Sequence, residues 1–537
     1  MMKKSQNIAD FGKNGDRVLT TVEKEDLPPL PPPYDKVEKE KEWKQISAEK
    51  RQEVTCNLDG FVGLSLPVPK DKKEEQELVD KFAAGLGKLL TRENNWGFLQ
   101  PLTLTLEYCA KCQTCSDACP VYMESGKNDV YRPTYRSEVW RRLVNKYVKK
   151  GSKLMAKLKH GDIDLNWTTI SRLYELCYRC TMCRRCAQAC PMGVDNALVT
   201  HELRKMFSQE LGWAPTELHD KGTVLQLKVG SSTGMSQLVV KDNMEFVDED
   251  FSEITGLKAE TQWDKEGADV LLIHNAGEIM AWPENPAAFA IILNAAGVNW
   301  TLSSEEPSYD GVNYGLFYDD FQLARIALKH AATAKKLKVK KILMGECGHQ
   351  HKAMMTISDR ILVGDMNVPK ESCIPFLEEI VFSGKIKFDP SKNDFPVTLH
   401  DPCNITRNLG IVEPQRRILR HLCPQFREMT PHGVENYCCG GGSGFAIMSG
   451  NNFADWRVSV SGRRKFKQIL DAFSDQPGPE VKKYICAPCS NCKGQMRDIL
   501  EYYQAGEHSS IIYGGLVELI VNAMVDIKEP FIKWEQE

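Results

Sequence analysis

The sequence predicts a multidomain α+β protein in which a helical, cysteine-rich domain is followed by a duplicated α/β unit. Eight of the nine cysteines between Cys109 and Cys190 fall in two runs of identical spacing, inside helix-rich sequence. Downstream, short apolar runs alternate with helical stretches in two passes that lie roughly 130 residues apart. The length of 537 residues also exceeds what a single core of ordinary size holds.

Composition narrows the functional classes. The net charge of −3, with 42% apolar and 26% charged residues, is typical of a folded protein that binds neither nucleic acid nor anionic membrane. The lysine run Lys146–Lys159 is interpreted as a solvated helix face. There is no apolar run of membrane-spanning length, and the polar stretch Met1–Asn14 has no apolar signal-peptide core, so we expect a cytoplasmic location.

Residues 1–80 are predicted to form an extended, Pro-rich and charged N-terminal arm. The segment Pro28–Pro33 has five prolines and cannot continue a helix, and charged stretches flank it. The arm is expected to lie on a partner subunit or to be disordered, and the sequence favours neither.

Four further segments follow the arm. Residues 81–230 hold the first cysteine group in a helical domain, and residues 231–265 read as a connector. Residues 266–390 and 391–537 form the two α/β passes. Strands are expected at 268–273, 339–344, 397–400 and 483–485, with helices at 287–296, 321–336, 414–422 and 457–473.

Each of the two cysteine runs fits the spacing C-x2-C-x2-C-x3-C-P, which binds [4Fe–4S] clusters in bacterial ferredoxins. In such pairs the fourth cysteine of each run ligates the other cluster. One cubane is therefore expected on Cys109, Cys112, Cys115 and Cys190, and the second on Cys180, Cys183, Cys186 and Cys119.

Zinc is the rival interpretation, but it takes four ligands in two separated pairs rather than complete four-cysteine runs closed by Cys-Pro. Cys177 is surplus to the count and is interpreted as a buried residue. Arg179, Arg184 and Arg185 lie among the ligands. They either raise the potential of the nearby cluster or form a basic docking surface, and both interpretations remain open.

A third cysteine group lies in the second α/β pass: Cys403, then Cys438-Cys439-Gly440-Gly441-Gly442, then Cys486, Cys489 and Cys492. Adjacent cysteines do not easily share one zinc ion, and a vicinal disulfide is strained, whereas a larger iron–sulfur assembly accepts both. Gly440 and Gly441 let the backbone approach such a cluster and donate amides to it.

This C-terminal half resembles the CCG domain of the heterodisulfide reductase family. The resemblance implies a noncubane [4Fe–4S] cluster at which disulfides are cleaved, held by Cys403, Cys438, Cys439, Cys489 and Cys492. Cys486 forms a CxxC with Cys489, so these two are the alternative for the last pair of ligands. The first pass has Ser308-Tyr309-Asp310-Gly311 where Cys-Cys-Gly is expected, so it is interpreted as a degenerate repeat without a cluster of its own.

The order of a two-cluster ferredoxin-like (HdrC-like) domain, a degenerate CCG unit and an intact (HdrB-like) one resembles the D-type subunit. Over nearly its whole length the chain resembles more closely the K-type subunits (DsrK) of the Dsr membrane complexes (DsrMKJOP) of sulfate reducers and sulfur oxidisers. The resemblance implies a membrane cytochrome b partner (DsrM-like) with the other complex subunits, quinol chemistry, and a small sulfur-carrier protein (DsrC-like) whose disulfide or trisulfide is the substrate. Association with the membrane is then peripheral, through partner subunits.

The alternative function is that of a pure electron-transfer subunit, like those of glycerol-3-phosphate, glycolate or lactate oxidation. The enzyme hypothesis places the substrate sulfur in a pocket between the two repeats, because ligand crevices lie at the carboxyl ends of strands in such sheets. The candidate catalytic residues there are Cys347 and His349 from the first repeat, and His400 and His432 from the second.

Overall fold

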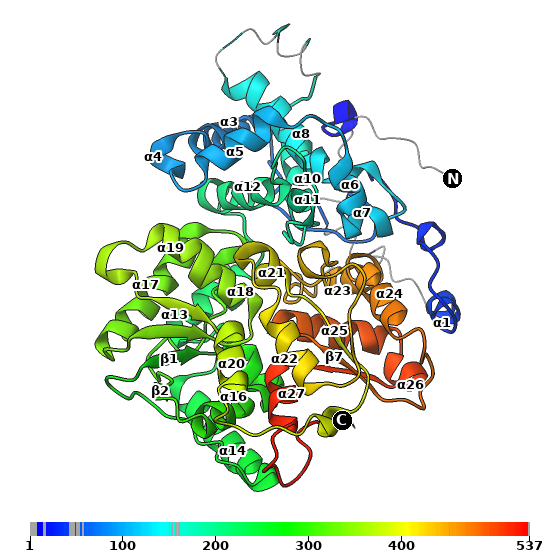
Figure 1. The fold of residues 1–537 in the computed structure, drawn as a ribbon. Helices are drawn as coiled ribbons and strands as arrows, with labels where there is room; N and C mark the ends of the chain where they lie inside the picture. The colour runs from blue at the N-terminus through cyan, green and yellow to red at the C-terminus, as the bar shows by residue number, and fades with distance from the viewer. Residues whose placement is uncertain are drawn as a thin grey trace. The chain divides into compact units, whose positions relative to one another are not determined.

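The computed structural model describes residues 8–13, 18–41, 49, 54–55, 58–149, 151, 154–155, 158, 162–450 and 452–534 (Figure 1). The chain forms two compact units. The helical unit comprises Met1–Pro215, Phe317–Asp319 and Gly440–Lys465, and the two-sheet unit comprises Thr216–Leu316, Asp320–Cys439 and Phe466–Glu537.

The helical unit is built around α12 (Asn196–Leu211), which packs against α3 (Lys72–Leu89), α8 (Pro133–Leu143) and α10 (Trp167–Cys177). The side chain of Asp195 caps α12 by accepting from two backbone amides, and Gly212 ends it in the left-handed conformation. The other helices of this unit are α1 (Tyr34–Glu40), α4 (Arg92–Asn95), α5 (Leu99–Tyr108), α6 (Thr114–Ala118), α7 (Pro120–Glu124), α11 (Arg185–Gln188) and α23 (Phe453–Trp456).

The described part of the N-terminal arm packs onto its own chain. Phe11, Leu58 and Val62 are fully buried, and the Thr20 hydroxyl donates to Asn128 at 2.6 Å. The interpretation of an arm lying on a partner subunit therefore does not hold for these residues, because their apolar side chains are covered within the helical unit. Residues 1–7, 14–17 and most of 42–57 lie outside the described ranges.

The first α/β repeat is a parallel sheet of β1 (Val270–Ile273), β2 (Trp300–Thr301), β3 (Lys341–Met344) and β4 (Lys370–Ser372), in the order β2-β1-β3-β4. Its fully buried β1 has the continuous apolar sequence that parallel strands require. Its helices are α15 (Ala276–Ala281), α16 (Glu284–Ala295), α17 (Asp320–Lys336), α18 (Gly348–His351), α19 (Ser358–Ile361) and α20 (Cys373–Phe382); α13 (Leu225–Val229) and α14 (Gln237–Thr255) precede it.

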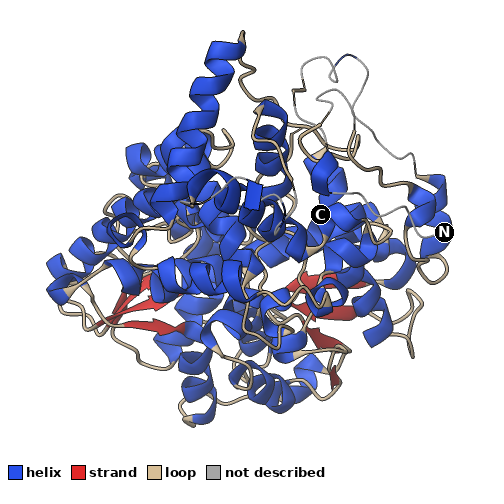
Figure 2. Ribbon diagram, turned by 90° about the horizontal axis from the view of Figure 1, so that it is seen from above, coloured by secondary structure: helices blue, strands red, loops and turns tan. Residues whose placement is uncertain are grey.

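The second repeat has the same topology: β5 (Val397–Leu399), β6 (Phe426–Arg427), β7 (Lys483–Cys486) and β8 (Ile511–Gly514) form a parallel sheet in the order β6-β5-β7-β8. Figure 2 shows the strands of the two sheets surrounded by helices. Those of the second repeat are α21 (Cys403–Leu409), α22 (Pro414–Leu422), α24 (Arg463–Ala472), α25 (Ser490–Tyr502), α26 (Ala505–Ser509) and α27 (Leu516–Asn522). The predicted fold class, including the duplication, is confirmed.

The two repeats share one apolar core inside the two-sheet unit. Buried side chains from both sheets, together with α16 and α27, belong to a single contiguous cluster. Helix α16 packs directly against α27, and the run Ala287–Leu293 in α16 is completely buried. Each large apolar side chain buried in this way contributes about 1.5–3 kcal/mol, so the repeats stabilise one another and hold their strand ends in a fixed relation.

No helix among the described residues is long and apolar enough to cross a membrane.

Candidate functional site

The two cysteine runs of the helical unit fold into the same loop. In the first run the residues on either side of Cys112, Lys111 and Gln113, have φ values of 56° and 66°. In the second run the residues on either side of Cys183, Met182 and Arg184, have φ values of 49° and 61°. Each run thus has two left-handed non-glycine residues, at matching positions. They turn the backbone so that the cysteines of that run face one point.

Each run is set between helices that fix its ends. In the first, Cys109 ends α5, Cys115 lies in α6, and Cys119 precedes Pro120 at the start of α7. Proline suits that first helical position because its missing N–H needs no partner there. In the second, backbone amides approach the sulfur atoms: Met182 N donates to Cys180 Sγ, and Val194 N to Cys190 Sγ, both at 3.4 Å.

Thiols of the two runs lie close enough to interact with one another. Burial, together with the nearby thiols of Cys109, Cys119, Cys190 and Cys112, raises the pKa of Cys115 to about 12. Burial likewise raises the pKa of Cys119 to about 12, and there the contributing thiols are Cys183 and Cys180 of the other run. Cys119 therefore interacts with thiols of both runs, and Cys190 interacts with a thiol of the first, so the crossed assignment of ligands stays a prediction.

These thiols suit iron–sulfur clusters. No disulfide joins any of the eighteen cysteines that the structure describes, and the four-sulfur groups have amide donors at their edges. Burying four thiols around one point is costly for thiolates unless positive metal ions compensate their charge. Cys177, which was left out of the ligand count, is fully buried at the end of α10.

The arginines inside the second run are paired. Arg179 is completely buried, with its guanidinium 3.1 Å from Asp59 and 2.5 Å from Glu175. Arg184 pairs with Asp195 at 2.8 Å, and Arg185 donates to the carbonyl of Ala118 at 2.6 Å. Because Arg179 is inaccessible, the basic docking surface that the sequence left open does not include it.

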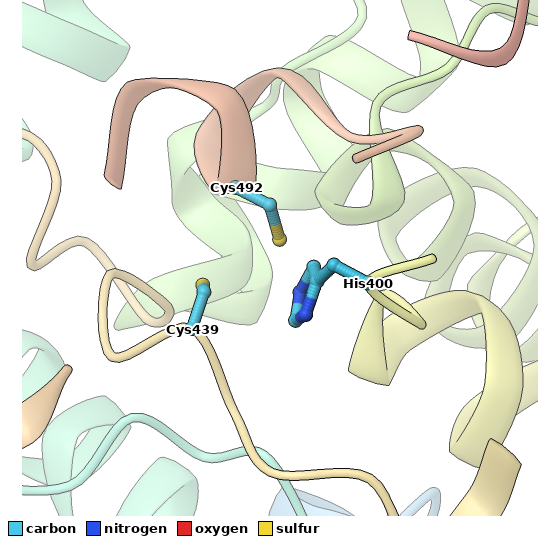
Figure 3. Close-up of side chains that lie close together, drawn as sticks. All are labelled: His400, Cys439 and Cys492. Atoms are coloured by element: carbon cyan, nitrogen blue, oxygen red, sulfur yellow. The ribbon is translucent and has the colours of Figure 1, made fainter. Parts of the chain in front are cut away.

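The third cysteine group gathers at the carboxyl end of the second sheet. His400 directly follows β5, and Cys403 is the first residue of α21. Cys489 is the N-cap of α25, and Cys492 lies in the first turn of that helix. The ligand atoms of His400, Cys439 and Cys492 all lie within 4.8 Å of one another and point toward a common centre (Figure 3).

Interacting thiols continue from Cys439 to the first repeat. Contacts with the thiols of Cys438 and Cys492 hold the pKa of Cys439 well below its usual value, against the effect of burial and with help from His400. Contacts with Cys347 and Cys492 lower the pKa of Cys489 in the same way, and His349 adds to them. Thiols from both repeats therefore meet in one buried group.

The first repeat supplies Cys347 and His349 to this group through a loop equivalent to that of Cys489. Cys347 is the N-cap of α18, as Cys489 is of α25, and both follow the third strand of their repeat. The amide of Gly348 donates to Cys489 Sγ at 3.3 Å, and Nδ2 of Asn275 lies 3.2 Å from Cys347 Sγ. A methyl group at Gly348 would lie only 3.2 Å from Cys489 Sγ, closer than most such contacts, so glycine favours this approach.

The remaining predicted residues fall in different places. Cys403 is buried, and its neighbours Pro402 and Asn404 lie against Gly348, which places Cys403 at the rim of the group. Cys486 ends β7 inside the shared core with Cys423, away from the other thiols. His432 is exposed beside a short 3₁₀ turn, and the described contacts do not bring it to the cysteines.

The glycines after Cys439 serve packing in the helical unit. Gly440 has a φ of 95°, and a methyl group there would lie 2.5 Å from the backbone of Gly462. Gly442 packs against the carbonyl of Thr181 in the second cysteine run, 2.9 Å from where its β-carbon would stand. For Gly441 the structure records a backbone bond from the Ala446 amide to its carbonyl, at 3.0 Å.

Sequence reasoning missed two amides at the site. Asn275 and Asn491 direct Nδ2 at Cys347 Sγ from 3.2 and 3.9 Å. Asparagines follow no metal-ligand spacing. The available signal was position: Asn275 comes shortly after the predicted strand 268–273, and Asn491 lies between Cys489 and Cys492.

Comparison with known proteins agrees with both parts of the chain. Residues 105–194 match the family described as "4Fe-4S dicluster domain", and residues 397–497 match "Cysteine-rich domain", the CCG family. The chain is 26% identical, over 81% of its length and 82% of the relative's, to the "Hdr-like menaquinol oxidoreductase iron-sulfur subunit 2" of Archaeoglobus fulgidus.

Two other relatives have a similar extent. The chain is 25% identical to the D-type subunit of the "Dihydromethanophenazine:CoB--CoM heterodisulfide reductase" of Methanosarcina acetivorans, over 74% of this chain and 89% of that one. It is 23% identical to the "EtfAB:quinone oxidoreductase" of Syntrophomonas wolfei, over 78% of this chain and 58% of that protein. The chain therefore carries a 4Fe-4S dicluster domain and a CCG domain, and over most of its length it is similar to Hdr-like iron–sulfur oxidoreductase subunits.

Proposed function

We propose that the chain is the catalytic iron–sulfur subunit of a membrane-bound, quinone-linked complex in dissimilatory sulfur metabolism, of the DsrK type. Electrons pass through two [4Fe–4S] cubanes to a noncubane [4Fe–4S] site, which reduces or oxidises the disulfide or trisulfide of a small sulfur-carrier protein (DsrC-like). A cytochrome b subunit (DsrM-like) and other subunits of the complex hold the chain peripherally at the membrane. The quinone link is supported by the relatives named for menaquinol and quinone.

The observation that carries this proposal is the single buried group of thiols and imidazoles built from both repeats. Cys403, Cys438, Cys439, Cys489 and Cys492 would hold the noncubane cluster, which supplies electrons one at a time to a two-electron reaction. Cys347 and His349 reach the same group from the repeat that has no cysteine pair of its own. A purely structural lid needs neither a thiol nor an imidazole at this point.

Cleavage of a disulfide takes two electrons and two protons and yields two thiols. His349 beside Cys489, and His400 beside Cys439, are the groups placed to deliver those protons to the product sulfurs. Cys347 can instead attack the substrate disulfide, releasing one half as a thiol and holding the other as a mixed disulfide, which two electrons and two protons then cleave. Asn275 and the amide of Gly348 orient the two sulfur atoms between which the substrate would bind.

The order of the electron carriers follows from exposure and chain connection. Cys112 of the first run is exposed to solvent, which suits the cluster that meets an electron donor. The second run packs against Gly442, three residues after Cys439. We therefore propose that the cubane on the first run receives the electron and passes it to the cubane on the second run.

The test is paramagnetic resonance of the oxidised, anaerobically reconstituted protein, with and without the reduced carrier protein. A new signal is expected only when the carrier protein retains its terminal cysteines, and a carrier with both replaced by serine is the control. An unchanged spectrum at full iron content would support the alternative, a pure electron-transfer subunit of the kind that serves glycerol-3-phosphate, glycolate or lactate oxidation.

A further inference from the structure

Arg204, which lies outside both cysteine runs, contacts the second run directly. It is completely buried in α12, and its Nη2 donates to the carbonyl oxygens of Cys177 at 3.0 Å and Cys180 at 3.1 Å. Its Nη1 donates to the carbonyl and hydroxyl oxygens of Ser443 at 2.9 and 2.7 Å. Within the described residues, the ion pairs of this unit include no carboxylate for Arg204.

Arg136 approaches the same run from α8. It is 4% exposed, and its Nε donates to the Thr200 hydroxyl at 2.9 Å, which holds it between α8 and α12. Its guanidinium lies within electrostatic range of the thiols of Cys180, Cys177, Cys119 and Cys186. Its charge, too, meets no carboxylate among the residues that the structure describes.

The cations beside the first run are different, because they are ion-paired with carboxylates and lie nearer to solvent. Lys111 lies 2.9 Å from Glu138, and Arg142 lies 3.2 Å from the same carboxylate. Arg132 lies 2.5 Å from Asp129. The two four-cysteine sites therefore have the same ligands and loops, but the cations Arg136 and Arg204 beside the second are more deeply buried, where water screens their charge less.

We propose that Arg136 and Arg204 hold the reduction potential of the cubane on the second run above that of the cubane on the first. One-electron reduction adds a negative charge to a cluster, and a buried cation without a counter-charge stabilises that reduced state. Guanidinium groups stay protonated, so the effect persists across the working pH range. Electrons then collect at the cubane on the second run.

The inference uses the cubane assignments of the proposed function but not its disulfide chemistry. Arg204 also joins the carbonyl of Cys180 to Ser443, four residues after Cys439. The same side chain that tunes the second cubane thus also fixes the loop leading to the noncubane site.

The test is a redox titration of both cubane signals by paramagnetic resonance in the wild type, Arg136→Gln and Arg204→Gln. We expect one cubane to become harder to reduce, by tenfold or more in the ratio of reduced to oxidised cluster at fixed potential, about 59 mV for a one-electron couple. The other cubane stays unchanged. Arg136→Lys, which keeps the charge, restores most of the wild-type potential, and Arg142→Gln beside the first run is the matched control.

Two further variants keep the test decisive. Cys119→Ser should alter the signal of the same cubane that the arginine variants shift, which identifies it as the second-run cluster. Ser443→Asp leaves Arg204 in place but gives it a carboxylate, and should lower the same potential even if the glutamine variants bind iron poorly. Equal shifts in both cubanes, or none at full cubane iron, would overturn the inference. A protein that reduces no disulfide can still show the shift, so the two proposals fail separately.

Discussion

The two α/β repeats share one topology but differ in what stands at their strand ends. Both sheets are parallel, with the same strand order, and the loop after the third strand places a cysteine at a helix N-cap in each. At the carboxyl ends of its strands the second repeat gathers several thiols. At the same place the first repeat has one cysteine, Cys347, together with carboxylate and amide side chains. The scaffold has therefore been kept where the cluster chemistry has been replaced.

Asp310 shows how the first repeat fills the place of the missing cysteine pair. It is completely buried, and its Oδ2 accepts from the amide and hydroxyl of Ser232, both at 2.7 Å. Gln350 lies against Gly311 and donates to the carbonyl of Ile273 at 2.7 Å. Polar groups that satisfy one another leave no set of soft ligands for a metal.

The largest loss of turnover is expected when a cysteine of the second repeat is replaced. Cys439→Ser should reduce turnover of a disulfide substrate by about 10³-fold or more, because it removes a proposed ligand of the reacting cluster. Both cubane signals should persist in this variant. Cys423→Ser is the matched control, since Cys423 lies in the core of the same repeat; an equal loss there would point to misfolding and not to the cluster.

A smaller loss is expected from the cysteine that the first repeat retains. Cys347→Ser should lower turnover by about 10²-fold, with full iron content, because a covalent or proton-transfer partner is lost. Cys373→Ser, in the same repeat and also buried, should leave the rate near that of the wild type. Near-normal turnover in Cys347→Ser would mean that the first repeat takes no part in the chemistry and only covers the site.

The histidines test which side delivers protons. His349→Gln should lower turnover by roughly 10-fold to 10²-fold, because a proton donor beside the product sulfur is lost. His432→Gln should have no effect, since His432 is exposed and away from the group. If His432 proved as important as His349, the arrangement of the site would be wrong.

The smallest expected effect is on stability, and it concerns a contact between Glu346 of the first repeat and α27 of the second. The Glu346 carboxylate accepts from the amides of Leu516 at 2.8 Å and Val517 at 3.1 Å, and so caps α27. Burial raises the pKa of Glu346 from 4.5 to about 7, with Lys493 opposing the shift. The folded state therefore favours the protonated acid, and its stability should fall as pH rises from 4.5 to 7, by up to about 3 kcal/mol.

In Glu346→Gln this pH dependence should be weaker, because the amide does not ionise. The free energy of unfolding, measured by denaturant titration at pH 5 and pH 7, is the readout. The exposed Glu260→Gln variant should keep the wild-type slope. An unchanged slope in Glu346→Gln would mean that the carboxyl group is already neutral, or already ionised, throughout this range.

The sequence predicted the longer elements because their patterns extend over enough residues. The apolar run at β1 and the helix Pro414–Leu422 have the expected bounds within a few residues. The strands β2 and β6, with two residues each, are too short for any period to be visible. The packing of the arm was missed because proline-rich, charged sequence does not indicate which apolar side chains will find a surface.

The site was predictable where chemistry imposes spacing, and not elsewhere. Cys109, Cys180 and their companions follow a ligand pattern, and Cys347 was found by its position after a strand. Arg136 and Arg204 lie in ordinary helical sequence, and only the folded chain brings them to Cys180. Charge balance around a site depends on contacts between distant segments, such as Asp59 with Arg179, which no local pattern contains.

The iron content of the reconstituted chain tests the central claim most directly. Three four-iron clusters predict about twelve irons per wild-type chain, and about eight in Cys438→Ser/Cys439→Ser. A wild-type value near eight, unchanged in the double variant, would mean that the cysteines of the second repeat hold no cluster, and would contradict the account.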